Sequence, residues 1–230
     1  MLPPIRHPGQ EFDPQLNAYI GFDAAVPSRF VVFASLSICG RASGTVAIYS
    51  SDTGQWSYLQ SKWDSGNPVD CGQGTRFFLN GTMHWPTVHN SIVTVDSEGK
   101  VWGEIKLPDD LRKSSHRISF GLSQGSLYAW QGRFLASPLY IWVLEDYGTG
   151  KWILKHTVNV LDLFGSHGRE VEYYYMMFAI HPDCNVIFLS NQKMTVSYNL
   201  DNHKLDVICN ESMYGLPYVP CFAELPSACH

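Results

Sequence analysis

A serine between two glycines is the pattern in this sequence that could carry covalent catalysis. Gly121-Leu-Ser123-Gln-Gly125 matches the G-x-S-x-G pattern of a nucleophile elbow. An elbow needs a strand, a sharp turn and then a helix, which together expose the serine Oγ. Here residues 127–130 follow with the composition of a strand, so a turn between two strands explains both glycines. If the serine were a nucleophile, its partners in chain order would be Asp162 or Asp183, and His203.

Several histidines could act as metal ligands, namely His84, His89, His181 and His203. None of them has the i, i+4 spacing of a helical metal site, and none lies beside a cysteine pair. Ordinary hydrogen-bonded histidines in strands and loops explain them better. We therefore expect no catalytic residue, no metal site and no cofactor.

Three tryptophans share one position, because Trp56, Trp102 and Trp152 each follow closely on a turn glycine. Such a repeated position favours packing between sheets over the lining of a ligand cleft. Trp85 and Trp130 fall outside this pattern.

Trp63 also falls outside it. It lies in a polar loop and is the candidate anchor for a protein partner. Asp64, Asp110 and Arg112 lie in connections between strands, where recognition residues are often found, so we predict a protein-binding site with Trp63. Asp70, Asp109 and Lys113 share this setting, and plain solvation is the other interpretation of these charges.

The elements that would position these residues are strands. Residues 91–108 show the unit most clearly, since the run Ile92–Val95 leads through a turn at Gly99 into an alternating strand after Lys100. Asn80-Gly81 between two strand-like runs predicts another hairpin. Residues 158–171, broken at Gly165, are the plausible helix, and residues 109–116 have room for one helical turn.

The hairpins recur. They begin near Val46, Ile92, Ile141 and Thr195, which gives a spacing of about 46 to 54 residues, the size of a kelch-type propeller blade. Four-strand sets are recognisable at residues 75–107, 117–155 and 173–208, and a partial or degenerate set precedes them. A β-sandwich is the alternative, but it would not explain the period.

We therefore predict an all-β fold, a kelch-like β-propeller of about four recognisable four-stranded blades, incomplete or open. It would form a single domain over residues 1–230, with a partial blade and N-terminal segment at 1–45 and repeats at 46–225.

Composition sets limits on partners and compartment. The 230 residues are 45% hydrophobic and 16% charged, enough for a packed core. The net charge is −5 and there is no basic cluster, which argues against nucleic acid as the main partner. The sequence contains no run of 18 apolar residues, so it predicts no transmembrane helix. The 6 cysteines are scattered without a Cys-x-x-Cys pair, and no secretory signal is visible. We expect reduced thiols and a cytoplasmic or nuclear protein.

Six short motifs, taken in their order and spacing, carry a family resemblance. The chain resembles the C-terminal, F-box-associated region of plant F-box proteins over nearly its whole length. The motifs are Leu2-Pro-Pro-Ile-Arg-His-Pro, Tyr19-Ile-Gly-Phe-Asp23, Ile48-Tyr-Ser-Ser-Asp-Thr-Gly-Gln-Trp56, Phe78-Leu-Asn-Gly-Thr-Met-His-Trp85, His181-Pro-Asp183 and Tyr218-Val-Pro-Cys-Phe-Ala-Glu224.

The resemblance implies a kelch-like propeller that captures a target protein, as the substrate-binding region of an SCF-type ubiquitin ligase does. In that family an F-box helical domain docks onto the Skp-type adaptor of the cullin ligase. Residues 1–45 contain no apolar helical repeat with caps, so we expect the Skp-type adaptor as a partner only if an F-box lies upstream. The alternatives are a serine hydrolase that uses the GLSQG turn and a truncated, non-functional fragment.

Overall fold

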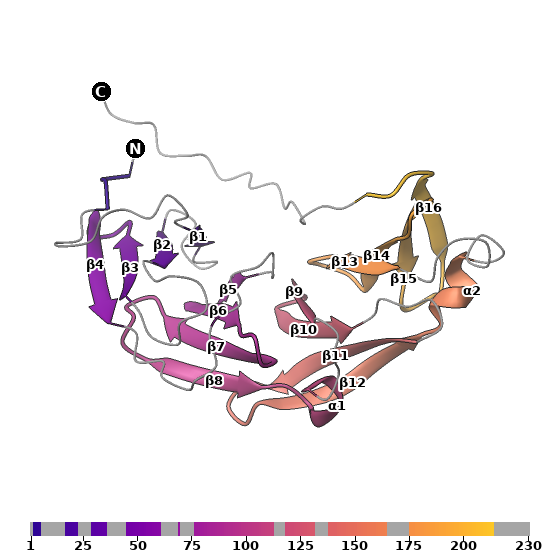
Figure 1. The fold of residues 1–230 in the computed structure, drawn as a ribbon, viewed down its shortest axis with the longest axis horizontal. Helices are drawn as coiled ribbons and strands as arrows, with labels where there is room; N and C mark the ends of the chain where they lie inside the picture. Colours follow the sequence, from indigo (N-terminus) through magenta and orange to yellow (C-terminus); the bar gives the residue numbers. More distant parts are fainter. Residues whose placement is uncertain are drawn as a thin grey trace. The chain divides into compact units, whose positions relative to one another are not determined.

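A computed structural model shows a chain built from four-stranded antiparallel sheets and short helices (Figure 1). The structure describes residues 2–5, 17–22, 29–35, 45–60, 69, 76–112, 118–131, 138–164 and 175–213. These residues divide into two compact units, with the boundary between Lys106 and Leu107. Within the described ranges, no helix has the length and apolar character to span a membrane.

The first unit holds two sheets. Sheet 1 consists of β1 (Asn17–Phe22), β2 (Phe30–Ser35), β3 (Thr45–Ser50) and β4 (Gln55–Gln60). Sheet 2 consists of β5 (Phe77–Leu79), β6 (Thr82–Pro86), β7 (Ser91–Asp96) and β8 (Trp102–Lys106). In both sheets each strand pairs with the next along the chain, as in a meander.

The second unit repeats this plan with a short helix before each sheet. After α1 (Asp109–Arg112), sheet 3 consists of β9 (Ser119–Ser123), β10 (Ser126–Gln131), β11 (Leu139–Asp146) and β12 (Lys151–Val158). After α2 (Val160–Phe164), sheet 4 consists of β13 (Met176–Ile180), β14 (Val186–Ser190), β15 (Thr195–Asn199) and β16 (Leu205–Cys209). Strands again pair in chain order.

Tight turns keep this meander in register. Asn80 and Gly81 have φ of 50° and 74°, the left-handed conformation that a two-residue hairpin turn requires. The turn joins β5 to β6, with Leu79 paired to Thr82. The hairpin predicted from Asn-Gly is therefore confirmed.

Each unit buries its core between its two sheets. In the first unit the core comprises Val31, Phe33, Val46, Ile48, Met83, Trp85, Val93 and Val95. In the second unit, sheets 3 and 4 share a larger cluster that includes Ile141, Met177 and Ile187. A single sheet cannot bury both of its faces, so each pair of sheets is stabilised by the removal of one face of each from water.

The repeat predicted from the hairpin spacing matches the sheets, because the predicted hairpin starts fall in β3, β7, β11 and β15, the third strand of each. Two details differ. The first set, predicted to be partial, has all four strands, since β1 and β2 are short but fully paired. The helix predicted at 158–171 is limited to Val160–Phe164 within the described residues, because Val158 belongs to β12. The single helical turn predicted after residue 108 is present as α1.

Candidate protein-binding surface

The serine of the G-x-S-x-G pattern is a structural residue in a hairpin turn. Ser123 ends β9, and β10 begins at Ser126, so a strand follows the turn where an elbow needs a helix. Ser123 is 1% exposed, and its Oγ donates a hydrogen bond of 2.7 Å to the carbonyl oxygen of His181. A buried hydroxyl held on a backbone carbonyl is not presented to a substrate.

The turn instead fastens sheet 3 to sheet 4. The backbone N–H of Gln124 donates to the carbonyl of Pro182 at 2.6 Å, and its side-chain amide donates to Asn185 Oδ1 at 3.0 Å. Gln124 and Gly125 have φ of 50° and 71°, as a tight hairpin turn requires. The turn therefore explains Gly125, and the bond to His181 explains Ser123. Gly121 has its own reason, because an added Cβ would lie 2.9 Å from Cγ2 of Ile180 in sheet 4.

The candidate partners of the serine have contacts of their own. Asp162 accepts a hydrogen bond of 2.8 Å from Asn159, and His203 Nδ1 lies 2.8 Å from the hydroxyl of Tyr198. Asp183 donates its backbone N–H to the imidazole of His181. None of these contacts brings a carboxylate or an imidazole nitrogen to Ser123 Oγ, which bonds only the backbone carbonyl of His181 among the contacts described, so the described geometry does not assemble a triad.

His84 belongs to the core of sheet 2. It is fully buried, stacks on Phe77 with ring centroids 4.8 Å apart, and donates from Nδ1 to the carbonyl of Thr82 at 3.0 Å. Burial lowers the pKa of His84 to about 4, because the charged imidazolium loses its hydration. His89 is exposed. Among the described residues, no three His, Cys, Asp or Glu side chains gather as metal ligands.

The tryptophans divide by the face on which they lie. Trp102 packs against the core of the first unit and lies 6.1 Å from Trp85, centroid to centroid. In the second unit Trp130 is buried and donates from Nε1 to the carbonyl of Met177 at 2.9 Å, which joins sheet 3 to sheet 4. Packing between sheets, predicted for Trp102, is confirmed. Trp152 is half-buried on β12 and lies opposite Leu144.

Trp56 does not join this core. It pairs with Tyr49 across β3 and β4, and the neighbouring pair joins Phe22 to Phe30 across β1 and β2. The four rings follow one another across sheet 1, with centroid distances of 6.3 Å for Phe22–Phe30, 6.0 Å for Phe30–Tyr49 and 5.5 Å for Tyr49–Trp56. We call these four residues the aromatic row.

The aromatic row lies on the face of sheet 1 opposite to the core. Val31 and Phe33 of β2 point into the core, and alternation along a strand sends Phe30 to the other side. Phe22 is 54% exposed, and the other three rings are half-buried. A face of four half-exposed aromatic side chains is typical of a surface that another molecule or segment covers.

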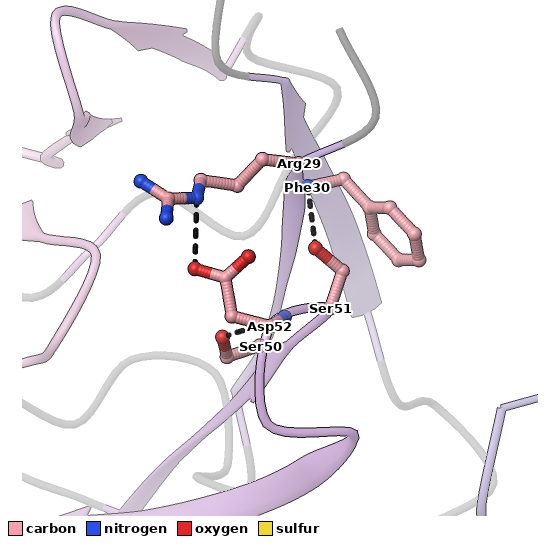
Figure 2. Close-up of polar contacts among 5 residues, drawn as sticks. All are labelled: Arg29, Phe30, Ser50, Ser51 and Asp52. Atoms are coloured by element: carbon pink, nitrogen blue, oxygen red, sulfur yellow. Dashed lines mark hydrogen bonds and ion pairs between the residues drawn. The ribbon is translucent and has the colours of Figure 1, made fainter. Parts of the chain in front are cut away.

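Polar contacts hold the start of β2, where Phe30 of the aromatic row lies, to the turn between β3 and β4 (Figure 2). The N–H of Phe30 donates to Ser51 Oγ at 2.8 Å, and the N–H of Ser51 donates to the carbonyl of Phe30 at 3.0 Å. Arg29 Nε contacts Asp52 Oδ2 at 2.8 Å, with both side chains about half exposed. The ion pair lies on the other side of β2 from the Phe30 ring (Figure 2).

The structure places two of the residues predicted for protein binding on α1. Leu111, 2% exposed, anchors this turn of helix, and its N–H donates to the carbonyl of Pro108 at 3.0 Å. Asp110 is exposed beside it, and Arg112 ends the helix. Trp63, Asp64, Asp70 and Lys113 lie outside the described residues, so the predicted site stays a prediction.

Sequence reasoning missed Phe22, Phe30 and Tyr49 as surface residues. Parity gave no clear signal, because both faces of β2 are apolar: Phe30 and Val32 alternate with Val31 and Phe33. Trp56 and Trp102 share the same local pattern, so the sequence predicts packing for both and offers no means of separating them.

Comparison with known proteins now adds to these observations. A family model described as "F-box protein At3g26010-like, beta-propeller" matches residues 26–225. The described residues form four four-stranded meander sheets in chain order, and the chain is an all-β protein of the β-propeller class. In particular, it belongs to the F-box protein At3g26010-like β-propeller family, which confirms the resemblance to F-box-associated regions of plant proteins.

A curated relative agrees with this assignment. The chain is 23% identical over 160 residues to F-box protein At5g49610 of Arabidopsis thaliana. The match covers 66% of this chain and 41% of that protein, so the chain spans less than half the length of this relative.

Solved structures with a similar fold include a chain of the mitotic checkpoint complex, with a TM-score of 0.43 and 12% identity over 85% of this chain and 53% of that one. Another belongs to the core factor of S. cerevisiae, with a TM-score of 0.49 and 8% identity over 89% of this chain and 36% of that one. A third is an acylaminoacyl peptidase of Pyrococcus horikoshii, with a TM-score of 0.44 and 10% identity over 84% of this chain and 32% of that one.

Proposed function

We propose that this chain is a protein-recognition module that binds its target as the substrate-binding region of an SCF-type ubiquitin ligase does. The observation that carries the proposal is membership in an F-box protein propeller family over residues 26–225. The work of such a region is to hold another protein, and the module would act without catalysis in the cytoplasm or nucleus. The buried position of Ser123 supports this assignment against a hydrolase.

The binding residues we propose are Trp63, Asp64, Asp110 and Arg112. Trp63 would supply a large apolar anchor, and the charged residues would orient the partner and exclude wrong ones. The exposed position of Asp110 on α1, a helix held by buried Leu111, supports the idea of a rigid acidic contact. A Skp-type adaptor would join the complex only through an F-box outside residues 1–230.

The proposal is tested by giving the chain an F-box. We would fuse residues 1–230 to a heterologous F-box domain, express the fusion in plant cells and measure protein half-lives across the proteome. We expect the half-life of at least one protein to fall. A cullin-ligase inhibitor should block this effect, and the purified protein should bind directly to the purified chain.

Matched variants test whether the four named residues contribute to binding of the target protein. Substitution of Trp63, Asp64, Asp110 and Arg112 by alanine should restore the half-life of that protein. The exposed pair Glu98 and Lys100, in the turn between β7 and β8, serves as the control when changed to alanine. If no protein responds to the fusion, the proposed function is wrong; if both variants act alike, the assigned residues are wrong.

A further inference from the structure

Sheet 3 differs from sheet 1 at one position of the repeat. In sheet 1, Leu59 pairs with Val46 on the face that packs against sheet 2, and it lies against Gly99 in the turn between β7 and β8. In sheet 3, His156 holds the equivalent position, because it pairs with Ile141 on the face that packs against sheet 4. An apolar side chain at the contact between two sheets is thus replaced by a titratable one in the second unit.

The His156 ring has a buried nitrogen without a hydrogen-bond partner. In the part of the chain that the structure describes, Nε2 of His156 and the hydroxyl of Tyr175 are the buried side-chain nitrogen and oxygen atoms that lack one. A neutral imidazole has one N–H to satisfy, whereas an imidazolium has two and also carries a charge that loses its hydration. The folded chain therefore favours the neutral ring at this position.

A β-bulge adds a positive charge beside this ring. The pairing of β11 with β12 shifts by one residue next to His156, and Lys155 is the extra residue, whereas β3 and β4 pair without a shift. The ammonium of Lys155 donates to the hydroxyl of Tyr128 at 2.6 Å and lies 5.1 Å from the centroid of that ring. Tyr128 belongs to the core cluster that sheets 3 and 4 share, so the bulge holds a cation on the same face as His156.

The turn between β15 and β16 supplies the other charged and titratable groups around His156. Asp201 and His203 of this turn both interact electrostatically with the His156 ring. Asp201 Oδ1 accepts a hydrogen bond of 2.8 Å from the side chain of Asn185. His203 Nδ1 lies 2.8 Å from the hydroxyl of Tyr198, which is buried in the shared core. The ring therefore faces a carboxylate and a second imidazole from sheet 4, and an ammonium from its own strand.

These surroundings oppose protonation of the folded chain. Burial, followed by the charge of Lys155, lowers the pKa of His156 from its usual 6.5, and Asp201 offsets part of this effect. When the pH falls below 6.5, an unfolded or locally open chain therefore binds a proton at His156 more readily than the folded chain does. The folded state loses stability as a result.

We propose that His156 makes the contact between sheets 3 and 4 sensitive to protons, so that mild acid loosens β12 from the turn between β15 and β16. This inference goes beyond the proposed function, because it concerns the stability of the second unit and names no partner. Between about pH 7.5 and 5.5 the opening equilibrium should shift by at most roughly tenfold, the rise in the ratio of total to neutral imidazole in an open chain.

The experiment is hydrogen exchange of the whole chain at about pH 7.5 and 5.5, followed by mass spectrometry and corrected for the intrinsic exchange rates. Protection of β12 should fall by roughly two- to tenfold at the lower pH. His156→Leu, which introduces the residue type found at position 59 of sheet 1, should remove most of this fall. His156→Gln makes the same test with a polar side chain if the leucine variant does not fold.

The neighbouring charges add a test of sign. Lys155→Met removes a cation that repels the charged ring, so the midpoint of the His156 titration, followed by NMR, should rise. Asp201→Asn removes a carboxylate that attracts the charged ring, so the same midpoint should fall. Shifts in the same direction in the two variants would contradict the proposed arrangement of charges.

The matched control is His89→Gln, which removes an exposed histidine of the first unit and should leave the response of β12 unchanged. If His89→Gln and His156→Gln reduce that response equally, the effect belongs to total charge and the inference is wrong. It is also wrong if the His156 ring titrates at or above 6.5 in the wild type. Loss of the response in His203→Gln, with none in the His156 variants, would assign it to His203 instead.

Discussion

Trp56 and Trp102 hold the same position in two adjacent repeats and do opposite things. Trp102 lies against the buried core of the first unit, and its indole N–H is satisfied within its own turn by Gly99. Trp56 lies in a half-exposed row of rings, and its N–H reaches Pro3, 53 residues away in the sequence. The difference comes from what covers each sheet and not from the local sequence.

The comparison shows that, in a chain of repeated sheets, the burial of a side chain depends on whether an adjacent sheet covers its face. Every four-stranded sheet presents two apolar faces, and each needs a partner to leave water. Sheet 1 covers one face of sheet 2 with Val31 and Phe33, while its own second face shows aromatic rings to the surface. Whether a face is buried therefore depends on whether a second sheet packs against it.

The largest expected effect is a difference in the free energy of unfolding between substitutions on the two faces of sheet 1. Phe33→Ala should lower the free energy of unfolding by about 3–5 kcal/mol, because Phe33 is fully buried against Phe78 and Trp85. Phe22→Ala should cost less than about 1 kcal/mol, because that ring is 54% exposed. Urea unfolding followed by circular dichroism measures both, and equal losses would contradict the assignment of the two faces.

The turn glycines give a second contrast between the same sheets. Gly99 has φ of 71°, and an added Cβ would overlap the side chain of Leu59 from sheet 1, whereas Gly54 has φ of 67° and open space around it. Gly54→Ala should therefore cost about 1–2 kcal/mol for the left-handed backbone alone. Gly99→Ala should cost about 2–4 kcal/mol, because the overlap adds to that strain. Thermal melts would refute this if the two variants lost equal stability.

The third contrast uses pH, because sheet 2 buries His84 and the described strands of sheet 1 contain no histidine. Burial lowers the pKa of His84 from 6.5 to about 4 in the folded state. Between those values the unfolded chain binds the proton and the folded chain does not, so stability is lost as the pH falls from 6.5 toward 4. The loss should be about 2–3 kcal/mol.

The measurement is the free energy of unfolding at a series of pH values, for the wild type and for His84→Gln. Carboxylates also titrate in part of this range, and they contribute equally to both proteins. The difference between the two curves therefore isolates the imidazole. Parallel curves would mean that His84 is protonated as easily in the folded protein as in the unfolded one.

The sequence was sufficient to predict the strands and the spacing of their repeat. It was not sufficient to predict which face of each sheet is covered by another sheet. Alternation in Ile92–Val95 and the Asn80-Gly81 turn are local signals, and the structure confirms the hairpins that they predicted. Whether a face is covered depends on contacts between distant strands, such as Phe33 with Trp85. Trp56 and Trp102 therefore look alike in the sequence. Ser123 matches the nucleophile pattern, but the strand after it already favours a hairpin turn, and its buried bond to His181 agrees with that interpretation.

The smallest expected effects lie at the start of β2, where two kinds of contact tie this strand to the turn between β3 and β4. Arg29→Gln removes an ion pair whose members are 51% and 47% exposed, so it should cost no more than about 0.5 kcal/mol, and less still in 0.5 M salt. Ser51→Ala removes the acceptor of the Phe30 N–H, and we expect about 1 kcal/mol at any salt concentration. Urea unfolding at low and high salt separates the two, because only a charge-dependent term is screened. A salt-dependent loss in Ser51→Ala would contradict a neutral hydrogen bond at Phe30. A salt-independent loss in Arg29→Gln would mean that Arg29 acts through packing and not through its ion pair.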